Sequence, residues 1–406
     1  MVMLHNSWKF RYYSFCIFIF LLISCGRQEN SNLGYIVIHE AKPLEKVMDF
    51  TRYIDHIEFI PLHDNIFLEG ISRIYFCDDK LIVRDKKTRN DRIHFFDLKG
   101  NYLYSDNHIL DEYPQSEPFA MTSLPDFALD CPNSTLYLSD ISRNHIVQYH
   151  IPTRAKSLKF DNIRGQALHH KDSLLYVLTI DKQNGMLKLY NTETNEKVGE
   201  FIYDEKQDVG GGSTSNQMVN VEDEVVISLL NSDTIYKVFQ NVCKPYIALG
   251  NDEHTSTRFF HLNEVLDHYF SNNNDKFPYL MTPWGEITYI EGVMVLDLMN
   301  QRVLFIDMHE KKAFSLHKQY SSGRNQLFSS YLFYGIGHHD GLYHGSIKLT
   351  DSFYKYASQI VGEEPDHPLR HALSAFLDDY PPERNFQNPV ITRFKIREDF
   401  MDAFRS

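Results

Sequence analysis

The sequence is short of basic side chains. Its 406 residues include 41 Lys and Arg against 54 Asp and Glu, so the formal net charge is −13 at pH 7. Proteins that follow a phosphate backbone need clustered Lys and Arg. The charge balance therefore argues against a nucleic-acid partner. Aromatic residues are plentiful instead, with 25 Tyr and 29 Phe, and such side chains fit well in pleated sheets.

Motifs of common catalytic centres are also lacking. The chain has no G-x-S-x-G, Walker A or H-E-x-x-H motif and no cysteines at zinc spacing. The glycines at 210–212 are not followed by the Lys that completes a phosphate loop, so we interpret them as a flexible connection. Histidines gather at 338–344 and 367–371, but Asp340-Gly341 is a hairpin-turn signal and Pro368 interrupts the second group. We therefore predict no catalytic residue, no cofactor and no metal.

No apolar run near the N-terminus is long enough to span a membrane. The run Tyr12–Ile23 holds 12 residues, well short of the roughly 20 that a spanning helix needs. Basic residues precede it and Leu-Ile-Ser-Cys25 follows, which is typical of a secretory signal with a bacterial lipobox. An ordinary signal peptide with an incidental cysteine is the alternative. We predict a signal peptide at 1–24, then a lipidated Cys25 and flexible tether at 25–45.

The predicted location is therefore the cell envelope. We expect an exported protein that is lipid-anchored to the outer membrane. The sequence does not decide between the periplasmic and the outer surface of that membrane. An acidic protein stands off an anionic membrane surface. Contact with the membrane should therefore run through the lipid anchor only.

Three cysteines remain after this processing: Cys77, Cys131 and Cys243. Their spacing matches no metal-binding pattern. Buried, inert thiols are the favoured interpretation. In an exported protein two of them can instead pair and leave the third free.

A repeated hairpin pattern runs through the chain. Each unit has an alternating apolar strand, an Asp or Asn, a polar turn and a second alternating strand. Such units occur at 81–97, 136–150, 175–191, 225–239 and 293–307. A sixth begins at 342–347 and finds its partner strand at 389–396, after an insertion. Six such units predict an all-β fold, a six-bladed β-propeller, in which each sheet is covered by its neighbours.

The ring of such a fold must close. Ile57–Leu62 alternates ahead of the first full unit, and its Pro61 suits the edge of a sheet. We predict that this segment is the outer strand of the last blade, beside Val390–Ile396.

Two segments have the periodicity of helices, at 257–270 and 369–380. They lie in insertions at about 251–276 and 352–387. The first insertion falls between blades, and the second between the second and third strands of the last blade. By analogy with propellers in general, both should decorate one rim and wall a pocket over one end of the central channel.

Residues 140–149 (DISRNHIVQY) resemble the NHL-type blade pattern of an Asp, an Asn, a basic, an aliphatic and an aromatic residue. Residues 85–96 and 297–305 echo it. With the lipobox, the six repeats and the motifs NSDTIYKV and NPVITRFKI, the chain resembles a group of six-bladed β-propeller lipoproteins of Gram-negative gut bacteria, whose function is unassigned. The resemblance implies a propeller domain at 46–400.

Four residues are candidate ligand contacts on the predicted rim. Arg143 and Arg302 can bind an anionic group bidentately, or can be solvated turn charges. His145 stands where the repeat usually has Arg. Trp284, the sole tryptophan after residue 24, can stack on a sugar or pack in the core. Asp140 is interpreted as a turn-forming residue that binds local backbone N–H groups.

The favoured functional hypothesis is a non-catalytic binding or scaffolding module that recognises a glycan, peptide or envelope protein through one propeller rim. The alternative is a propeller hydrolase or lyase that uses rim carboxylates or histidines from several blades. Its residues cannot be named, because partners on different blades have no fixed spacing in sequence. A purely structural envelope component is the third hypothesis.

Overall fold

The computed structural model divides into two compact units, Met1–Ile36 and Val37–Ser406, and the second unit holds the fold. The structure describes residues 35–38, 41–43, 50–63, 66–68, 71–85, 92–106, 126–140, 143–180, 185–202, 217–229, 234–249, 283–298, 302–317, 337–339, 341–384 and 388–402.

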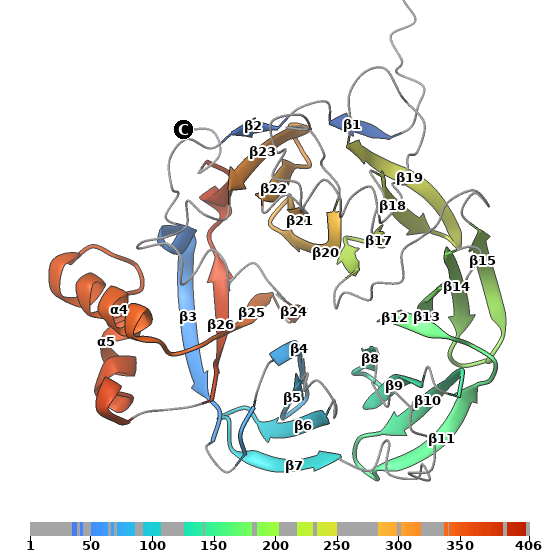
Figure 1. Cartoon of the computed structure of the whole chain (residues 1–406), viewed down its shortest axis with the longest axis horizontal. Coiled ribbons are helices and arrows are strands. Elements are labelled where there is room, and N and C mark those ends of the chain that lie inside the picture. The colour runs from blue at the N-terminus through green and yellow to red at the C-terminus, as the bar shows by residue number, and fades with distance from the viewer. Residues whose placement is uncertain are drawn as a thin grey trace, which may run out of the picture. The chain divides into compact units, whose positions relative to one another are not determined.

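Strands form six mainly antiparallel sheets around a common axis (Figure 1). Each sheet begins with its innermost strand and continues outward, as the blades of a propeller do. The predicted all-β, six-bladed propeller is therefore confirmed. From the axis outward, the first five blades contain β4 (Ile71–Cys77), β5 (Lys80–Asp85), β6 (Arg92–Asp97) and β7 (Tyr102–Asp106); β8 (Phe127–Asp130), β9 (Thr135–Asp140), β10 (His145–His150) and β11 (Ala155–Phe160); β12 (Gly165–Lys171), β13 (Leu174–Ile180), β14 (Gly185–Asn191) and β15 (Lys197–Ile202); β16 (Met218–Val221), β17 (Glu224–Ser228), β18 (Thr234–Phe239) and β19 (Val242–Leu249); and β20 (Pro283–Ile290), β21 (Val293–Leu298), β22 (Arg302–Asp307) and β23 (Lys312–His317).

The sixth blade closes the ring. It contains β24 (Gly337–His339), β25 (Leu342–Ile347), β26 (Val390–Ile396) and β3 (Ile54–Pro61), in that order outward. Strand β3 comes from the start of the fold and pairs antiparallel with β26, with Ile60 opposite Ile391. The predicted closure by the strand ahead of the first unit is confirmed.

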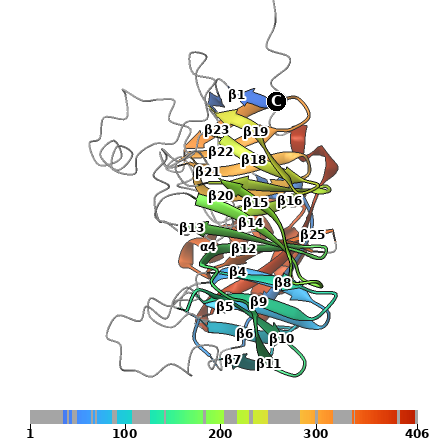
Figure 2. The same ribbon diagram turned by 90° about the vertical axis from the view of Figure 1, so that its right-hand side faces the viewer.

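Alternation of side chains lets each blade bind two neighbours. Successive side chains of a strand point to opposite faces. In β5, Leu81 and Val83 join a buried cluster that includes residues of the last blade, whereas Ile82 joins a cluster with the second blade. Figure 2 shows the same blades from the side. The hydrophobic core therefore lies between blades and continues around the axis.

Two short strands extend the fourth and fifth blades. β1 (Ile36–Ile38), whose last two residues belong to the second unit, is the fifth strand beside β19. β2 (Lys42–Pro43) pairs in parallel with β23. An outer strand leaves backbone N–H and C=O groups unpaired, and these extra strands cover them. The flexible tether predicted for 25–45 is therefore corrected at β1 and β2, which are attached to blade edges.

Two helices, α4 (Asp351–Glu363) and α5 (Arg370–Asp379), fill the insertion between β25 and β26. Thr350 caps α4, because its hydroxyl oxygen accepts a hydrogen bond from the Phe353 N–H. The helix predicted at 369–380 is confirmed as α5, and α4 is an additional helix. Phe353 and Phe376 pack on Phe59 of β3, with ring centroids 6.5 and 4.8 Å away.

This helical pair lies outside the ring, beside the outer strand of the last blade (Figure 1). The expectation that the insertion at 352–387 walls a pocket over the channel is therefore wrong. The apolar side chains of α4 and α5 pack against β3 instead. The other insertion, at 251–276, lies outside the described residues. In the described part of the chain, no helix is both long and apolar enough to cross a membrane.

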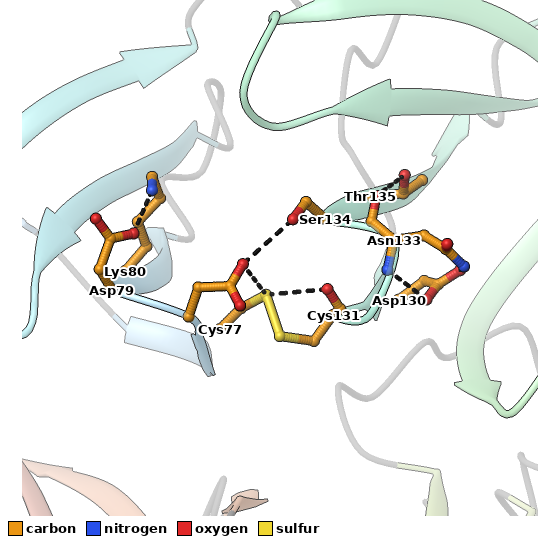
Figure 3. Close-up of a disulfide and its surroundings, with 9 residues drawn as sticks. Cys77, Asp79, Lys80, Asp130, Cys131, Asn133, Ser134 and Thr135 are labelled. Carbon is orange, nitrogen blue, oxygen red and sulfur yellow. Dashed lines mark hydrogen bonds and ion pairs between the residues drawn. A yellow bond between two sulfur atoms is a disulfide. The ribbon is translucent and has the colours of Figure 1, made fainter.

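A disulfide joins the inner strands of the first two blades (Figure 3). Cys77 ends β4, Cys131 follows β8, and their Cα atoms are 5.4 Å apart. The Ser134 hydroxyl, 3.2 Å from the Asp78 carboxylate, links the same two blades. The favoured interpretation of inert thiols is therefore wrong for this pair. Cys243 remains a free thiol, and burial raises its pKa to about 12.

Replacing both bonded cysteines, as Cys77→Ser with Cys131→Ser, should lower the free energy of unfolding by about 2–4 kcal/mol, because the bond closes a long loop in the unfolded chain. Denaturant unfolding followed by circular dichroism without reductant measures this loss. Cys243→Ser leaves the bond intact and is the control. Equal stability of the double variant and the wild type would contradict the assignment.

His94 of β6 is a buried imidazole at the contact between the first and last blades. It pairs across the sheet with Val83, so it shares the face whose cluster includes Ile60 and Ile391. His94 is 4% exposed, and neither ring nitrogen has a hydrogen-bond partner among the described residues. Burial lowers the pKa of His94 to about 4, and the Asp85 carboxylate opposes this shift only in part.

We predict that His94 makes the ring sensitive to mild acid. An unfolded His has a pKa of about 6.5, so the unfolded chain binds more protons than the folded chain as the pH falls from 6.5 to 4. Stability present above pH 6.5 is lost in this window, by up to about 3 kcal/mol. Thermal unfolding at several pH values should show a smaller loss for His94→Leu than for the wild type.

His56→Leu is the matched control for this experiment, because His56 is an exposed histidine of β3. It should keep the acid sensitivity of the wild type. Parallel pH profiles for His94→Leu and the wild type would refute the role of His94.

Candidate functional site

The turn at residues 140–145 is built from backbone contacts. Asp140 Oδ1 accepts a hydrogen bond of 3.1 Å from the Arg143 N–H. Asn144 has a φ of 59°, a left-handed conformation that Asn tolerates. The interpretation of Asp140 as a turn-forming residue is therefore confirmed. Arg143 is exposed in this turn, and His145 Nε2 lies 2.9 Å from an Asp161 carboxylate oxygen.

The other predicted contacts belong to a distant blade. Trp284 is the second residue of β20 and Arg302 the first of β22, both in the fifth blade, whereas Arg143 and His145 belong to the second. The side chains of Trp284 and Arg302 lie outside the described part of the structure, as does Cys25. The four residues predicted to touch a ligand are thus divided between the second and the fifth blade, and their joint role stays a prediction.

Three inner strands share an irregularity close to their start. The pairing of β4 with β5 shifts register around Ser72, and that of β12 with β13 around Gln166. The pairing of β20 with β21 shifts in a stretch that includes Trp284. Each of the three is the second residue of its strand. Such bulges re-aim a side chain and interrupt the ladder of hydrogen bonds.

A buried polar residue stands at the same place in the second and fourth blades. Asp126 precedes β8 and Gln217 precedes β16, and both are almost completely buried. Their backbone oxygens accept hydrogen bonds from the N–H groups of Ser139 and Ser228, at 3.1 and 2.9 Å. The residues at the starts of five inner strands are called the axial set: Ser72, Asp126, Gln166, Gln217 and Trp284.

Asp126 connects three blades at the axis. Its Oδ1 lies 2.6 Å from Arg73 Nη1 and 3.8 Å from Arg84 Nη1, both of the first blade. Its Oδ2 accepts a hydrogen bond of 2.8 Å from the Leu168 N–H of the third blade. Arg73 also donates to the backbone oxygens of Phe127 and Leu168. One carboxylate and one guanidinium group thus hold the first three inner strands together.

Two guanidinium groups share one carboxylate inside the protein. Arg73, Arg84 and Asp126 are all buried, where an unpaired charge is costly. Burial lowers the pKa of Arg73, but the Asp126 carboxylate and Tyr75 raise it, so that it lies above its ordinary value. Burial raises the pKa of Asp126, and Arg73 and Arg84 oppose that rise. The ion pair therefore serves as a tie between blades.

Side chains of other blades also hold inner-strand backbone. His344 Nε2 of the last blade lies 2.9 Å from the Ile74 oxygen of β4. The Ser139 hydroxyl of the second blade donates to the Gly165 oxygen of β12. Free strand edges around the axis expose backbone polar groups. These contacts satisfy several of them from neighbouring blades.

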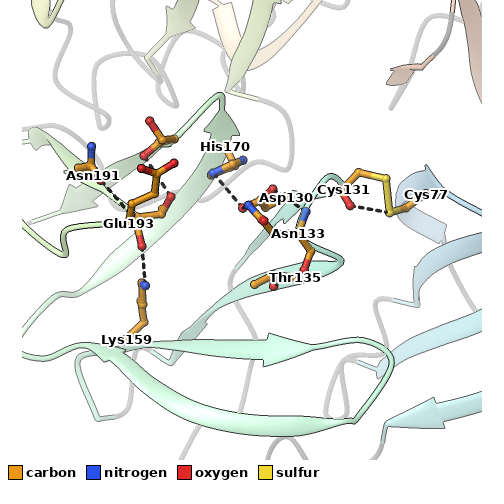
Figure 4. A network of polar contacts seen from close by, with 11 residues as sticks. Cys77, Asp130, Cys131, Asn133, Thr135, Lys159, His170, Asn191 and Glu193 are labelled. Atoms are coloured by element: carbon orange, nitrogen blue, oxygen red, sulfur yellow. Dashed lines mark hydrogen bonds and ion pairs between the residues drawn. A yellow bond between two sulfur atoms is a disulfide. The ribbon is translucent and has the colours of Figure 1, made fainter.

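The two histidines of β12 contact different blades. His169 Nε2 lies 2.8 Å from Asn220 Oδ1 of the fourth blade, and burial lowers the pKa of His169 to about 4. His170 Nε2 lies 3.6 Å from an Asp130 oxygen of the second blade (Figure 4). Neutral His169 is therefore a hydrogen-bonding group at physiological pH.

One group of the described residues brings three potential metal ligands close together: Cys77, Asp78 and Cys131. The disulfide uses both sulfur atoms of this group. Asp78 then offers a single carboxylate, fewer ligands than protein metal sites provide. The group does not fit a metal ion.

Two members of the axial set have unsatisfied oxygen atoms. Ser72 Oγ and Gln166 Oε1 are buried, and neither has a hydrogen-bond partner among the described residues. Leaving such a group unpaired costs about 1–3 kcal/mol. The starts of the inner strands therefore have spare hydrogen-bonding capacity.

Sequence reasoning missed Ser72 and Gln166, and it also missed Arg73 and Asp126. The one signal that these residues share is a polar residue at the start of an apolar strand.

Asp126→Asn should lower the free energy of unfolding by about 3–5 kcal/mol, because it leaves Arg73 and Arg84 buried without their carboxylate. Urea unfolding measures the loss. Asp161→Asn removes an exposed carboxylate paired with His145 and should cost less than about 1 kcal/mol. Similar losses for the two variants would show that Asp126 is not a tie between blades.

A family model and one similar crystal structure agree with this architecture. Residues 26–321 match a family described as a 6-bladed beta-propeller. A crystal structure of a candidate exported protein from Bacteroides fragilis NCTC 9343 is similar at a TM-score of 0.54, with 12% identity over 89% of this chain and 99% of that one. BamB from Moraxella catarrhalis is similar at 0.40, with 10% identity over 72% of each chain. No curated protein matches.

Proposed function

The chain belongs to the DUF5128 family of six-bladed β-propellers, and from this fold we propose a lipid-anchored recognition or scaffolding protein of the outer membrane. It holds a glycan, peptide or protein partner at the end of the axis where the inner strands start. The observation that carries the proposal is the unsatisfied hydrogen-bonding capacity of Ser72 and Gln166 at that end.

Export is supported by the chain itself. A disulfide such as Cys77–Cys131 persists in an oxidising compartment and is rare in the cytosol. The apolar run and Leu-Ile-Ser-Cys25 at the N-terminus have the order of a lipoprotein signal. The similar Bacteroides fragilis protein, itself named as a candidate for export, is in keeping with this location.

The contacts at the axis favour recognition over catalysis. A general acid or base must exchange its proton with a substrate within hydrogen-bonding reach. Asp126 instead binds Arg73 and the Leu168 N–H, and His169 contacts Asn220. These groups are engaged in joining blades. A rigid ring with preorganised polar groups at one end suits a binding protein.

A photo-crosslinking residue at Arg143 should capture a discrete envelope component in cells. Because β8 starts where β9 ends, the turn after β9 lies at the end of the axis that carries the axial set. Gel electrophoresis of irradiated cells measures the adduct.

The variant Cys25→Ala should move from the membrane fraction to the soluble fraction, because the lipid anchor is lost.

The same crosslinker at Asp223 is the control, because this exposed residue lies in the turn between β16 and β17, at the opposite end. It should give no adduct. Adducts from Asp223 and none from Arg143 would overturn the proposed binding end, and membrane retention of Cys25→Ala would overturn the anchor.

A further inference from the structure

Phe67 is the most exposed large apolar residue in the described part of the chain. It is 62% exposed, whereas Leu62 and Leu68 on either side of it are buried. Both leucines belong to the apolar cluster between the first and last blades. The loop from β3 to β4 is therefore anchored in the core on both sides of a phenyl ring that stays in water.

One buried amide group fixes this loop. Asn388 lies just before β26 and is the first residue of the motif NPVITRFKI. Its Oδ1 accepts a hydrogen bond of 3.0 Å from the Leu68 N–H, and its Nδ2 donates to the backbone oxygens of His63 and Ile66, at 3.1 and 2.7 Å. The three hydrogen bonds hold the backbone on both sides of Phe67.

Gly100 holds the beginning of the same loop. Its oxygen accepts a hydrogen bond of 3.0 Å from the His63 N–H. Gly100 has a φ of 83°, a left-handed conformation, and a Cβ atom there would overlap the Pro61 oxygen. The loop is therefore fixed from two sides. Loops that carry binding residues are positioned by a rigid scaffold in this way.

Phe67 lies at the end of the axis that carries the axial set. It precedes Ile71, the first residue of β4, by four residues, which span at most about 14 Å of extended chain. Ser72 of the axial set follows Ile71. The turn that contains Arg143 lies at the same end, because β8 starts where β9 ends. Phe67 therefore belongs to the end at which the proposed partner binds.

The surroundings of Phe67 suit an apolar pocket in another protein. The phenyl ring has no hydrogen-bonding group, and the Ile66 oxygen and the Leu68 N–H beside it already bind Asn388. A glycan, by contrast, needs hydrogen-bond partners for its hydroxyl groups. The formal net charge of −13 opposes contact with a second copy of this chain or with an anionic membrane surface. A different protein, neutral or basic around its pocket, meets these conditions.

We propose that Phe67 is the anchor by which this propeller binds an envelope protein, with its ring inserted into an apolar pocket of that partner. The inference rests on the proposed recognition function and narrows its ligand to a protein. Aromatic side chains are enriched in the cores of protein interfaces, and fixing them beforehand lowers the entropic cost of binding. Asn388 is a positioning residue, because it is buried and acts through the loop.

The photo-crosslinking residue at Arg143 is the probe for this anchor in cells. In the same protein, Phe67→Ala should lower the yield of the adduct by roughly tenfold or more, because truncation of an anchor residue weakens binding by at least this factor. Phe67→Leu, which keeps an apolar side chain, should lose less adduct than Phe67→Ser. All three variants should keep the melting temperature of the wild type, because Phe67 is exposed.

Phe239→Ala is the matched control. Phe239 is also exposed, but it ends β18 at the turn to β19, at the end of the axis that carries Asp223. The same change of Phe to Ala there should leave the Arg143 adduct at the yield of the wild type.

Asn388→Leu tests whether the loop must be fixed. It keeps Phe67 but removes three hydrogen bonds, so the adduct should again fall by roughly tenfold. Chymotrypsin, which cleaves after Phe, should cut after Phe67 roughly tenfold faster than in the wild type, with cleavage after Phe239 unchanged. Faster cleavage at both sites would report general unfolding, and the Phe67 variants then decide alone.

Two results overturn the inference: an undiminished Arg143 adduct in Phe67→Ala, or an adduct whose partner is a glycan, a lipid or a second copy of this chain by mass spectrometry. The first leaves the recognition function standing and removes only its anchor.

If Arg143 gives no adduct, a benzoylphenylalanine in place of Phe67 decides. An adduct that co-expressed wild-type chain prevents, and co-expressed Phe67→Ala chain does not, supports the anchor. Absence of any adduct removes the anchor and the recognition function together.

Discussion

The pairing of β26 with β3 is the contact on which the fold depends. It places Ile60 beside Ile391 and Ile57 beside Phe394, so the first and last strands of the propeller share one blade. The first blade is then held between two neighbours, with side chains of β5 buried on both faces of the sheet. The apolar cluster between the first and last blades forms only when the ring is closed. A six-bladed ring with one missing outer strand leaves an edge that water and other chains can reach.

Closure brings six inner strands together, and their polar groups must then be satisfied in a confined space. The protein does this with side chains that reach into the next blade: Arg73 to Phe127, Ser139 to Gly165, and His344 to Ile74. Ser72 Oγ and Gln166 Oε1, by contrast, have no hydrogen-bond partner among the residues that the structure describes. The residues that tie the blades therefore lie next to these two oxygen atoms in sequence: Arg73 follows Ser72, and Gly165 precedes Gln166.

The periodic parts of this fold could be predicted from the sequence. Strand alternation at 81–97 and 136–150 marked the blades, and the Asp140 turn followed from the known preferences of Asp and Asn. Contacts between blades could not be predicted. Cys77 and Cys131 are 54 residues apart, and Arg73 meets Asp126 across a similar stretch. No periodicity in sequence encodes such pairs, because blade packing alone brings them together.

The placement of β3 also sets an order of events in synthesis. A chain made from its N-terminus produces β3 before any blade, and β3 then waits for β26, almost the last strand of the chain. Contacts between such distant segments form slowly. A chain that stops before residue 390 has all strands of the first blade but lacks β26. Its β3 then has no strand to pair with. The ring therefore cannot close before β26 has been made.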